Sequence, residues 1–156
     1  MRIVGRIITY LVCVVLHVSG SPNPMITSID RCRCLSFAEA EARGLSVTEL
    51  REEYVVAVET FRDQKPELAS AWSELQYTLR DRLQETSVSD LGGRSFFSVV
   101  LFEPDGRIVW VFYRGLDPEE GPVFCNVVED LAEEYRFPLQ SNSGFSQCGT
   151  THFSEE

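Results

Sequence analysis

Apolar residues recur with the spacing of a helix in the part of the chain that follows residue 35. Ser36, with Glu39 three positions later, has the form of a capping box, in which each side chain satisfies a free backbone N–H of the other residue. Gly44 can end this helix, because glycine readily adopts the left-handed conformation common after helices. The sequence therefore predicts a short helix over 36–43.

A second helix is predicted to start at Ser46 or Thr48. Its apolar face would contain Val47, Leu50, Tyr54, Val58 and Phe61. The run 54–58 reads YVVAV, and its β-branched residues are also typical of a strand. We favour the helix and keep the strand as the alternative.

A third and longer helix is predicted from Pro66, because proline suits the first turn of a helix. Apolar residues then recur every three or four positions, as a single buried face requires: Leu68, Trp72, Leu75, Leu79 and Leu83. This stripe is most simply a surface that faces the core, and we assign Trp72 no cofactor role.

The pattern changes after residue 93 into two runs of aromatic and β-branched residues, 95–103 and 107–114. Pro104, Asp105 and Gly106 lie between them and favour a tight turn. The two runs therefore predict a β-hairpin.

Helical spacing returns after a loop over 115–122 that is rich in acidic and turn residues. The apolar positions of this fourth helix are Phe124, Val127, Val128, Leu131 and Tyr135, and Pro138 stops it. The segment 144–153 then predicts a last strand beside the hairpin. The whole pattern is an α+β fold, with a helical N-terminal half followed by a β-β-α-β antiparallel sheet whose helices pack on one face.

The first 20 residues have the order of a secretory signal. Arg2 and Arg6 precede an apolar run over 7–18, and small residues follow at 19–21. The run has 12 residues, whereas a helix needs about 20 to cross a membrane. We expect cleavage before Ser21 and a chain exported to the periplasm or the cell exterior without a stable membrane anchor. A membrane-tethered chain with an uncleaved signal is the alternative.

The remaining residues are enough for one core. We expect a helical extension over 21–65 and an α+β domain over 66–156. The chain has 24 acidic and 14 basic residues, a formal charge of -10. Loss of Arg2 and Arg6 with the signal would lower this charge by two, to -12. Such a charge favours solubility and opposes binding to nucleic acid or to anionic membrane surfaces.

Four cysteines follow the predicted signal, namely Cys32, Cys34, Cys125 and Cys148. An even number of cysteines in an exported chain predicts disulfides. A bond within Cys32-Arg33-Cys34 would close a strained ring, so we expect Cys32 and Cys34 to pair separately with Cys125 and Cys148, in an order that the sequence leaves open. A zinc site is the weaker alternative, because the usual spacing of paired ligands is missing.

The sequence provides no catalytic constellation, and we expect no catalytic residue, metal or cofactor. Cys148 and His152 would lie about 13 Å apart on one strand, beyond hydrogen-bond reach. The acidic pairs are adjacent in sequence on a loop or helix, at 119–120, 129–130 and 133–134. Phosphate-binding glycine loops and the common hydrolase motifs are absent from the sequence.

From Leu75 onward, the order helix, strand, turn, strand, helix, strand resembles the C-terminal domain family of TonB. The resemblance rests on the strand 97–102, the turn 104–108, the segment 111–119, the apolar helix residues Val127, Val128 and Leu131, the exit residues Tyr135, Phe137 and Pro138, and the closing residues Gly144 and 151–153. It covers about half of the chain after the signal. It implies a three-stranded antiparallel sheet with helices on one face, which binds a partner peptide as an added strand.

These observations predict an exported, non-catalytic protein-binding module whose partner is a protein or peptide in the cell envelope or outside the cell. The predicted binding edge is the last strand, with Phe145, Gln147, Thr150, Thr151 and Phe153. A small secreted hydrolase or thiol-redox protein is one alternative, and it requires a pocket that gathers at least two titratable groups. A purely structural, disulfide-stabilised domain is the other.

Overall fold

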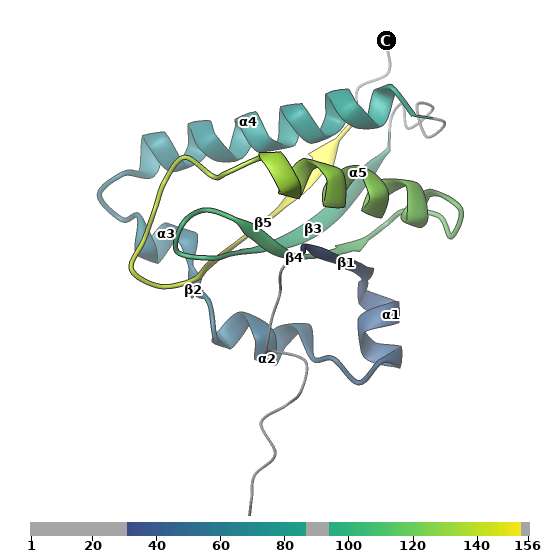
Figure 1. Cartoon of the computed structure of the whole chain (residues 1–156), viewed down its shortest axis with the longest axis horizontal. Helices are drawn as coiled ribbons and strands as arrows, with labels where there is room; N and C mark the ends of the chain where they lie inside the picture. The colour runs from purple at the N-terminus through teal and green to yellow at the C-terminus, as the bar shows by residue number, and fades with distance from the viewer. Residues whose placement is uncertain (1–30, 87–93, 154–156) are drawn as a thin grey trace, which may run out of the picture.

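The computed structural model describes residues 31–86 and 94–153 (Figure 1). The predicted signal and its cleavage point therefore lie outside the described residues. Within the described ranges, no helix is both long enough and apolar enough to span a membrane. The described chain forms a mixed sheet with helices, so the α+β class is confirmed.

The sheet has five strands in the order β1-β4-β3-β5-β2. The strands are β1 (Arg33–Ser36), β2 (Val55–Val56), β3 (Ser95–Phe102), β4 (Ile108–Arg114) and β5 (Phe145–His152). The antiparallel centre β4-β3-β5 is the predicted three-stranded sheet. The two outer strands come from the N-terminal half and run parallel to their neighbours. That half is therefore not a separate helical extension, because its strands complete the sheet.

The hairpin of β3 and β4 is confirmed, and its turn shows why the sequence bends there. The Asp105 carboxylate accepts a hydrogen bond from the Arg107 N–H at 3.1 Å. Gly106 has φ +81°, and a Cβ atom at this position would lie 2.3 Å from the Phe137 carbonyl oxygen. Only glycine combines this conformation with so close an approach of another backbone.

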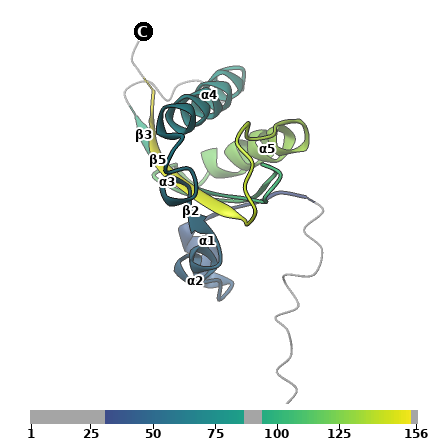
Figure 2. The same ribbon diagram turned by 90° about the vertical axis from the view of Figure 1, so that its left-hand side faces the viewer.

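Helices α4 (Lys65–Gln84) and α5 (Glu120–Glu134) cover one face of the sheet (Figures 1 and 2). The predicted stripe of α4 is buried at Leu68, Leu75, Leu79 and Leu83, and Trp72 packs at its margin. Burial of each leucine contributes about 2 kcal/mol. Phe96, Phe102, Phe124, Phe137 and Phe145 fill the space between these helices and the strands. This is the larger of the two cores.

Helices α1 (Phe37–Ala42) and α2 (Val47–Glu52) lie on the opposite face (Figure 2). The prediction that all helices pack on one face was therefore wrong. Strands β3 and β4 carry apolar side chains on both faces of the sheet. Val99, Leu101 and Phe112 point away from α4 and α5, and α1 and α2 shield them from water. The capping box is confirmed: the Ser36 hydroxyl accepts from the Glu39 N–H at 3.1 Å, and the Glu39 carboxylate accepts from the Ser36 N–H at 2.8 Å.

The predicted second helix does not continue to Phe61. After α2, the chain forms the two-residue strand β2 and then the short helix α3 (Ala57–Thr60). The Val55 N–H donates to the Gly144 carbonyl at 3.2 Å, and this bond ties β2 to the start of β5. The strand alternative for 54–58 is therefore correct at Val55 and Val56, because pairing with β5 outweighs the local helical pattern.

Candidate partner-binding edge

The outer side of β5 is only partly paired. On its inner side β5 pairs along its full length with β3, from Phe145 opposite Phe102 to His152 opposite Ser95. On its outer side β2 pairs with Phe145 and Ser146 alone. Among the described residues, no strand pairs with the outer side of β5 beyond Ser146. The last three quarters of β5 thus form an edge of the sheet.

Alternation along β5 identifies the backbone groups that face outward. The Gly144 carbonyl binds the Val55 N–H of β2, whereas the Phe153 N–H donates inward, to the Arg94 carbonyl at 2.9 Å. Backbone groups of an antiparallel strand alternate between its two sides. Even-numbered residues of β5 therefore direct their N–H and C=O outward. On the open stretch these residues are Cys148, Thr150 and His152.

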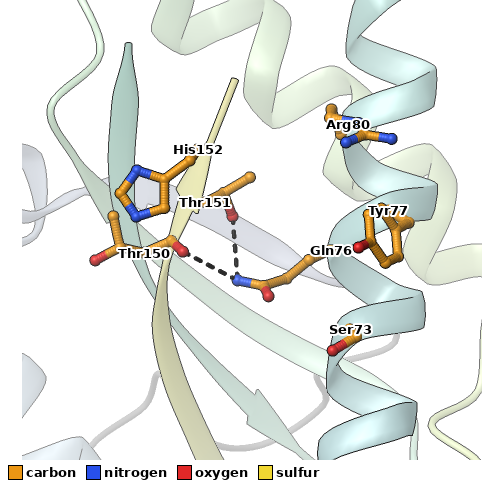
Figure 3. A pocket seen from close by; sticks show the side chains of 7 residues that line it. All are labelled: Ser73, Gln76, Tyr77, Arg80, Thr150, Thr151 and His152. Carbon is orange, nitrogen blue, oxygen red and sulfur yellow. Dashed lines mark hydrogen bonds between the residues drawn. The ribbon is translucent and has the colours of Figure 1, made fainter. Parts of the chain in front are cut away.

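Helix α4 runs beside this open stretch and forms a groove with it (Figure 3). The groove has a volume of about 160 Å³, and its walls are Ser73, Gln76, Tyr77 and Arg80 of α4 with Thr150, Thr151 and His152 of β5. The Gln76 amide donates to the Thr150 carbonyl and to the Thr151 hydroxyl, both at 3.4 Å. These are long hydrogen bonds, and so they hold the outward carbonyl of Thr150 only weakly.

Large apolar side chains are exposed at the start of the open stretch and in the groove beside it. Tyr77 on α4 is 56% exposed, and its ring lies 4.9 Å from the Arg80 guanidinium carbon. Val55 and Val56 on β2 are 42% and 37% exposed. Each is adjacent to the edge, since β2 pairs with the start of β5 and Tyr77 lines the groove between Ser73 and Arg80. The edge therefore combines backbone groups that are not paired with another strand of the described chain with adjacent exposed apolar side chains.

The five predicted edge residues differ in how far their side chains are exposed. Thr150 is exposed and Gln147 is half-buried. Phe145, Thr151 and Phe153 are buried, at 0%, 5% and 6% exposure. The side chains of the two phenylalanines pack in the larger core and are not available to a partner. Recognition at this edge would therefore depend on the backbone of Cys148, Thr150 and His152.

The α4 wall of the groove was not predicted as part of a binding site. Gln76 and Tyr77 are the residues that sequence reasoning missed. A signal was present, because Tyr77 is an aromatic residue that lies off the leucine stripe, between Leu75 and Leu79. An aromatic side chain on the polar side of an amphipathic helix marks a candidate contact surface.

One of the two predicted disulfides is confirmed. Cys34 of β1 is bonded to Cys125 of α5, with Cα atoms 5.2 Å apart and a sequence separation of 91. The bond ties the opposite edge of the sheet to the helix layer. Closure of so long a loop restricts the unfolded chain and contributes about 4 to 5 kcal/mol of stability.

The second predicted disulfide was wrong, because Cys32 and Cys148 are free thiols. Cys32 belongs to the core under α5, whereas Cys148 packs on the other face of the sheet. Three strand spacings, roughly 14 Å, also separate β1 from β5. Burial, followed by the charge of Glu129, raises the pKa of the Cys32 thiol to about 12, so this thiol stays protonated at neutral pH.

A second hollow, of about 410 Å³, lies between the start of α1 and the end of β4. It gathers Glu39, Tyr113 and Asp117, as the enzymatic alternative requires, but each group already serves the fold. The backbone and hydroxyl hydrogen bonds of Ser36 lower the pKa of the Glu39 carboxyl, and burial raises the pKa of the Tyr113 hydroxyl. Asp117 pairs with Arg94 at 3.3 Å.

Metal-ligating residues do not gather in the described structure. Within residues 31–86 and 94–153, no three His, Cys, Asp or Glu side chains lie close enough to hold a metal ion. The edge of β5 is therefore the candidate functional site. In comparisons with known proteins, no family model, no curated protein and no solved structure matches this chain.

Proposed function

We propose that this chain is an exported, non-catalytic protein-binding module that accepts an extended segment of a partner protein along the outer edge of β5. The observation that carries the proposal is the outward backbone of Cys148, Thr150 and His152, which no strand of the described residues pairs with, next to the exposed side chains of Val55, Val56 and Tyr77. Unpaired backbone groups at a sheet edge bind an added strand through the same ladder of hydrogen bonds that joins the strands of the sheet.

The groove beside α4 gives this edge a means of selection. Side chains of an added strand would alternate between the two faces of the sheet. On one face they would meet Gln76, Tyr77 and Arg80, in a space of about 160 Å³ that suits a single side chain. Backbone pairing would supply affinity, and this pocket would supply specificity.

Two further observations support the proposal. The β4-β3-β5 sheet and α5 have the order implied by the resemblance to the TonB C-terminal domain family, which binds partners by strand addition. The Cys34–Cys125 disulfide is typical of proteins that function in an oxidising compartment, such as the periplasm or the cell exterior. A chain tethered to the membrane through an uncleaved signal could bind a partner at the same edge of β5.

Selection from a displayed library of random peptides tests the proposal. The proline variant Thr150→Pro removes an outward N–H and leaves the β3–β5 ladder intact, because proline is tolerated where an edge N–H faces outward. Thr150→Ala is the matched control, since it keeps this N–H. Thr151→Pro is a poor test, because the Thr151 N–H faces β3 and its loss would damage the sheet itself.

We expect peptides that bind the wild-type chain and Thr150→Ala with similar affinity and bind Thr150→Pro at least tenfold more weakly. Circular dichroism should show that Thr150→Pro is folded. Peptides that bind all three forms equally would place the binding surface elsewhere. If neither peptides nor a second copy of the chain depend on Thr150, the purely structural alternative replaces this proposal.

A further inference from the structure

The open edge has two layers, and a single bound strand would cover only one of them. The lower layer is the free side of β5, and the upper layer is the wall of α4 that contains Ser73, Gln76, Tyr77 and Arg80. An added strand would pair with β5 but would leave much of this wall in water, including the 56% exposed Tyr77. A partner that matches both layers needs a strand with a helix packed beside it.

This chain itself presents such an edge. We propose, on the basis of the strand addition proposed above, that the partner is a second copy of this chain, bound by antiparallel pairing of the two β5 strands about a two-fold axis. Such an interface is self-complementary, because each copy offers the same surface to the other. The two sheets would join into one, with α4 of each copy on the same side.

The positions of the free backbone groups define one register. Hydrogen-bonded pairs must join outward-facing residues, and β2 already occupies the outer side of Phe145 and Ser146. An axis at Thr150 uses all three outward residues: Thr150 pairs with the partner's Thr150, and Cys148 pairs with the partner's His152. An axis at Cys148 would bring the second strand against β2, so steric overlap excludes it.

The same axis brings the two α4 helices together without a clash of charge. Gln76 contacts Thr150 and Thr151, so the axis passes α4 near Gln76 and Tyr77. Tyr77 would then lie near the partner's Tyr77, and Arg80 would lie near the partner's Ser73. The α4 wall of the groove contains no acidic side chain, although the chain has 24 acidic residues. The wall thus adds no pair of facing carboxylates to the repulsion expected of two chains with a formal charge of -10 each.

Sedimentation equilibrium of protein produced from the full-length sequence tests the inference. The wild-type chain should have twice the mass of one chain, and added salt should strengthen association by screening the net charge. Thr150→Pro removes a backbone donor at the axis, and Tyr77→Glu places two like charges across it. Each should weaken association at least tenfold. The matched controls, Thr150→Ala and the exposed α4 variant Ser70→Glu, should remain dimeric.

A cysteine pair tests the register directly. Hydrogen-bonded antiparallel partners have Cα atoms about 5.5 Å apart, within the range that a disulfide bridges. Thr150→Cys should therefore give a covalent dimer under mild oxidation, and Ser70→Cys should not. A wild-type chain that stays monomeric at about 0.1 mM would overturn the inference, as would dimers that persist in both Thr150→Pro and Tyr77→Glu. If the chain is monomeric but peptides still bind in a Thr150-dependent way, the proposed function stands and only the second copy is excluded.

Discussion

The two outer strands of the sheet differ in how firmly they are held. At one side, all four residues of β1 pair with β4, and the Cys34–Cys125 bond joins the strand to α5. At the other side, β2 pairs with only two residues of β5, and beyond it the Gln76 amide donates a long hydrogen bond to the Thr150 carbonyl, at 3.4 Å. The N-terminal half thus secures one side of the sheet and leaves the other accessible.

This difference separates stability from recognition. Covalent and core contacts concentrate around β1 and under the helices, so changes there should alter the free energy of unfolding. Changes along the open stretch of β5 should alter association and leave the fold intact, because Thr150 and His152 are exposed. The predictions below test this separation, from the largest expected effect to the smallest.

Removal of the disulfide should have the largest effect. The double variant Cys34→Ser with Cys125→Ser should lower the free energy of unfolding by about 4 to 5 kcal/mol, since the bond closes a loop of 91 residues. Urea unfolding followed by circular dichroism measures this loss. Cys148→Ser, which breaks no bond, is the control and should change stability little. A loss below about 1 kcal/mol in the double variant would show that the β1 side does not depend on this bond.

Phe145 tests whether the start of β5 belongs to the core or to the binding surface. Its side chain is fully buried, with ring centroids 4.8 Å from Phe102 and 5.0 Å from Phe61. Phe145→Ala should lower the free energy of unfolding by about 3 to 4 kcal/mol. The folded fraction should keep its affinity for selected peptides, as measured by titration. A folded variant that loses peptide binding without losing stability would mean that Phe145 contacts the partner.

Gln76 tests how lightly the open edge is covered. Its amide occupies the Thr150 carbonyl that an added strand would use, so Gln76→Ala should tighten peptide binding by roughly two- to fivefold, equivalent to one weak hydrogen bond. Isothermal titration against a selected peptide measures the change, with Ser70→Ala as control. Weaker binding in Gln76→Ala would mean that the contacts of Gln76 with the partner outweigh its competition for the Thr150 carbonyl.

The capping box beside β1 should give the smallest effect, with a defined dependence on pH. Glu39→Gln should lower the free energy of unfolding by about 0.5 kcal/mol at pH 7. The folded pKa of Glu39 lies below its unfolded value, because Ser36 donates to the carboxylate. Its contribution is therefore complete above about pH 4.5 and is lost as the pH falls through the folded pKa.

The difference between wild type and Glu39→Gln should thus disappear in acid, and chemical unfolding at pH 7 and pH 3 measures it. Glu41→Gln, on the same short helix, is the control. A stability difference that persists unchanged at pH 3 would show that the charge of Glu39 does not stabilise the box.

The elements that local pattern defines were predicted well from the sequence. The stripe of α4, the Asp105-Gly106 turn and the Ser36 capping box each depend on residues close together in the chain. Strand β1 was missed and β2 was kept only as an alternative, because four residues of β1 and two of β2 are too few to show a period. The two short strands form because they pair with β4 and β5, which lie far away in the sequence.

The role of the last strand as a binding edge stays a prediction, and the sequence did not show which of its side chains are exposed. The last strand was chosen as the edge, and the structure leaves most of its outer side free of β2. Which side chains face the core depends on strand register, so the burial of Phe145 and Phe153 was not visible in the sequence. The second disulfide failed for the same reason, because Cys32 and Cys148 lie on opposite faces.

Hydrogen exchange at the Thr150 and Thr151 amides, measured by NMR, tests the open edge most directly. The two residues are neighbours, but the Thr150 N–H faces outward and the Thr151 N–H faces β3. In dilute protein, Thr151 should be protected and Thr150 should exchange rapidly. Addition of a selected peptide, or a rise in protein concentration, should protect Thr150 and leave Thr151 unchanged. A Thr150 amide that is already protected in the dilute monomer, or that stays unprotected in the complex, would contradict the account.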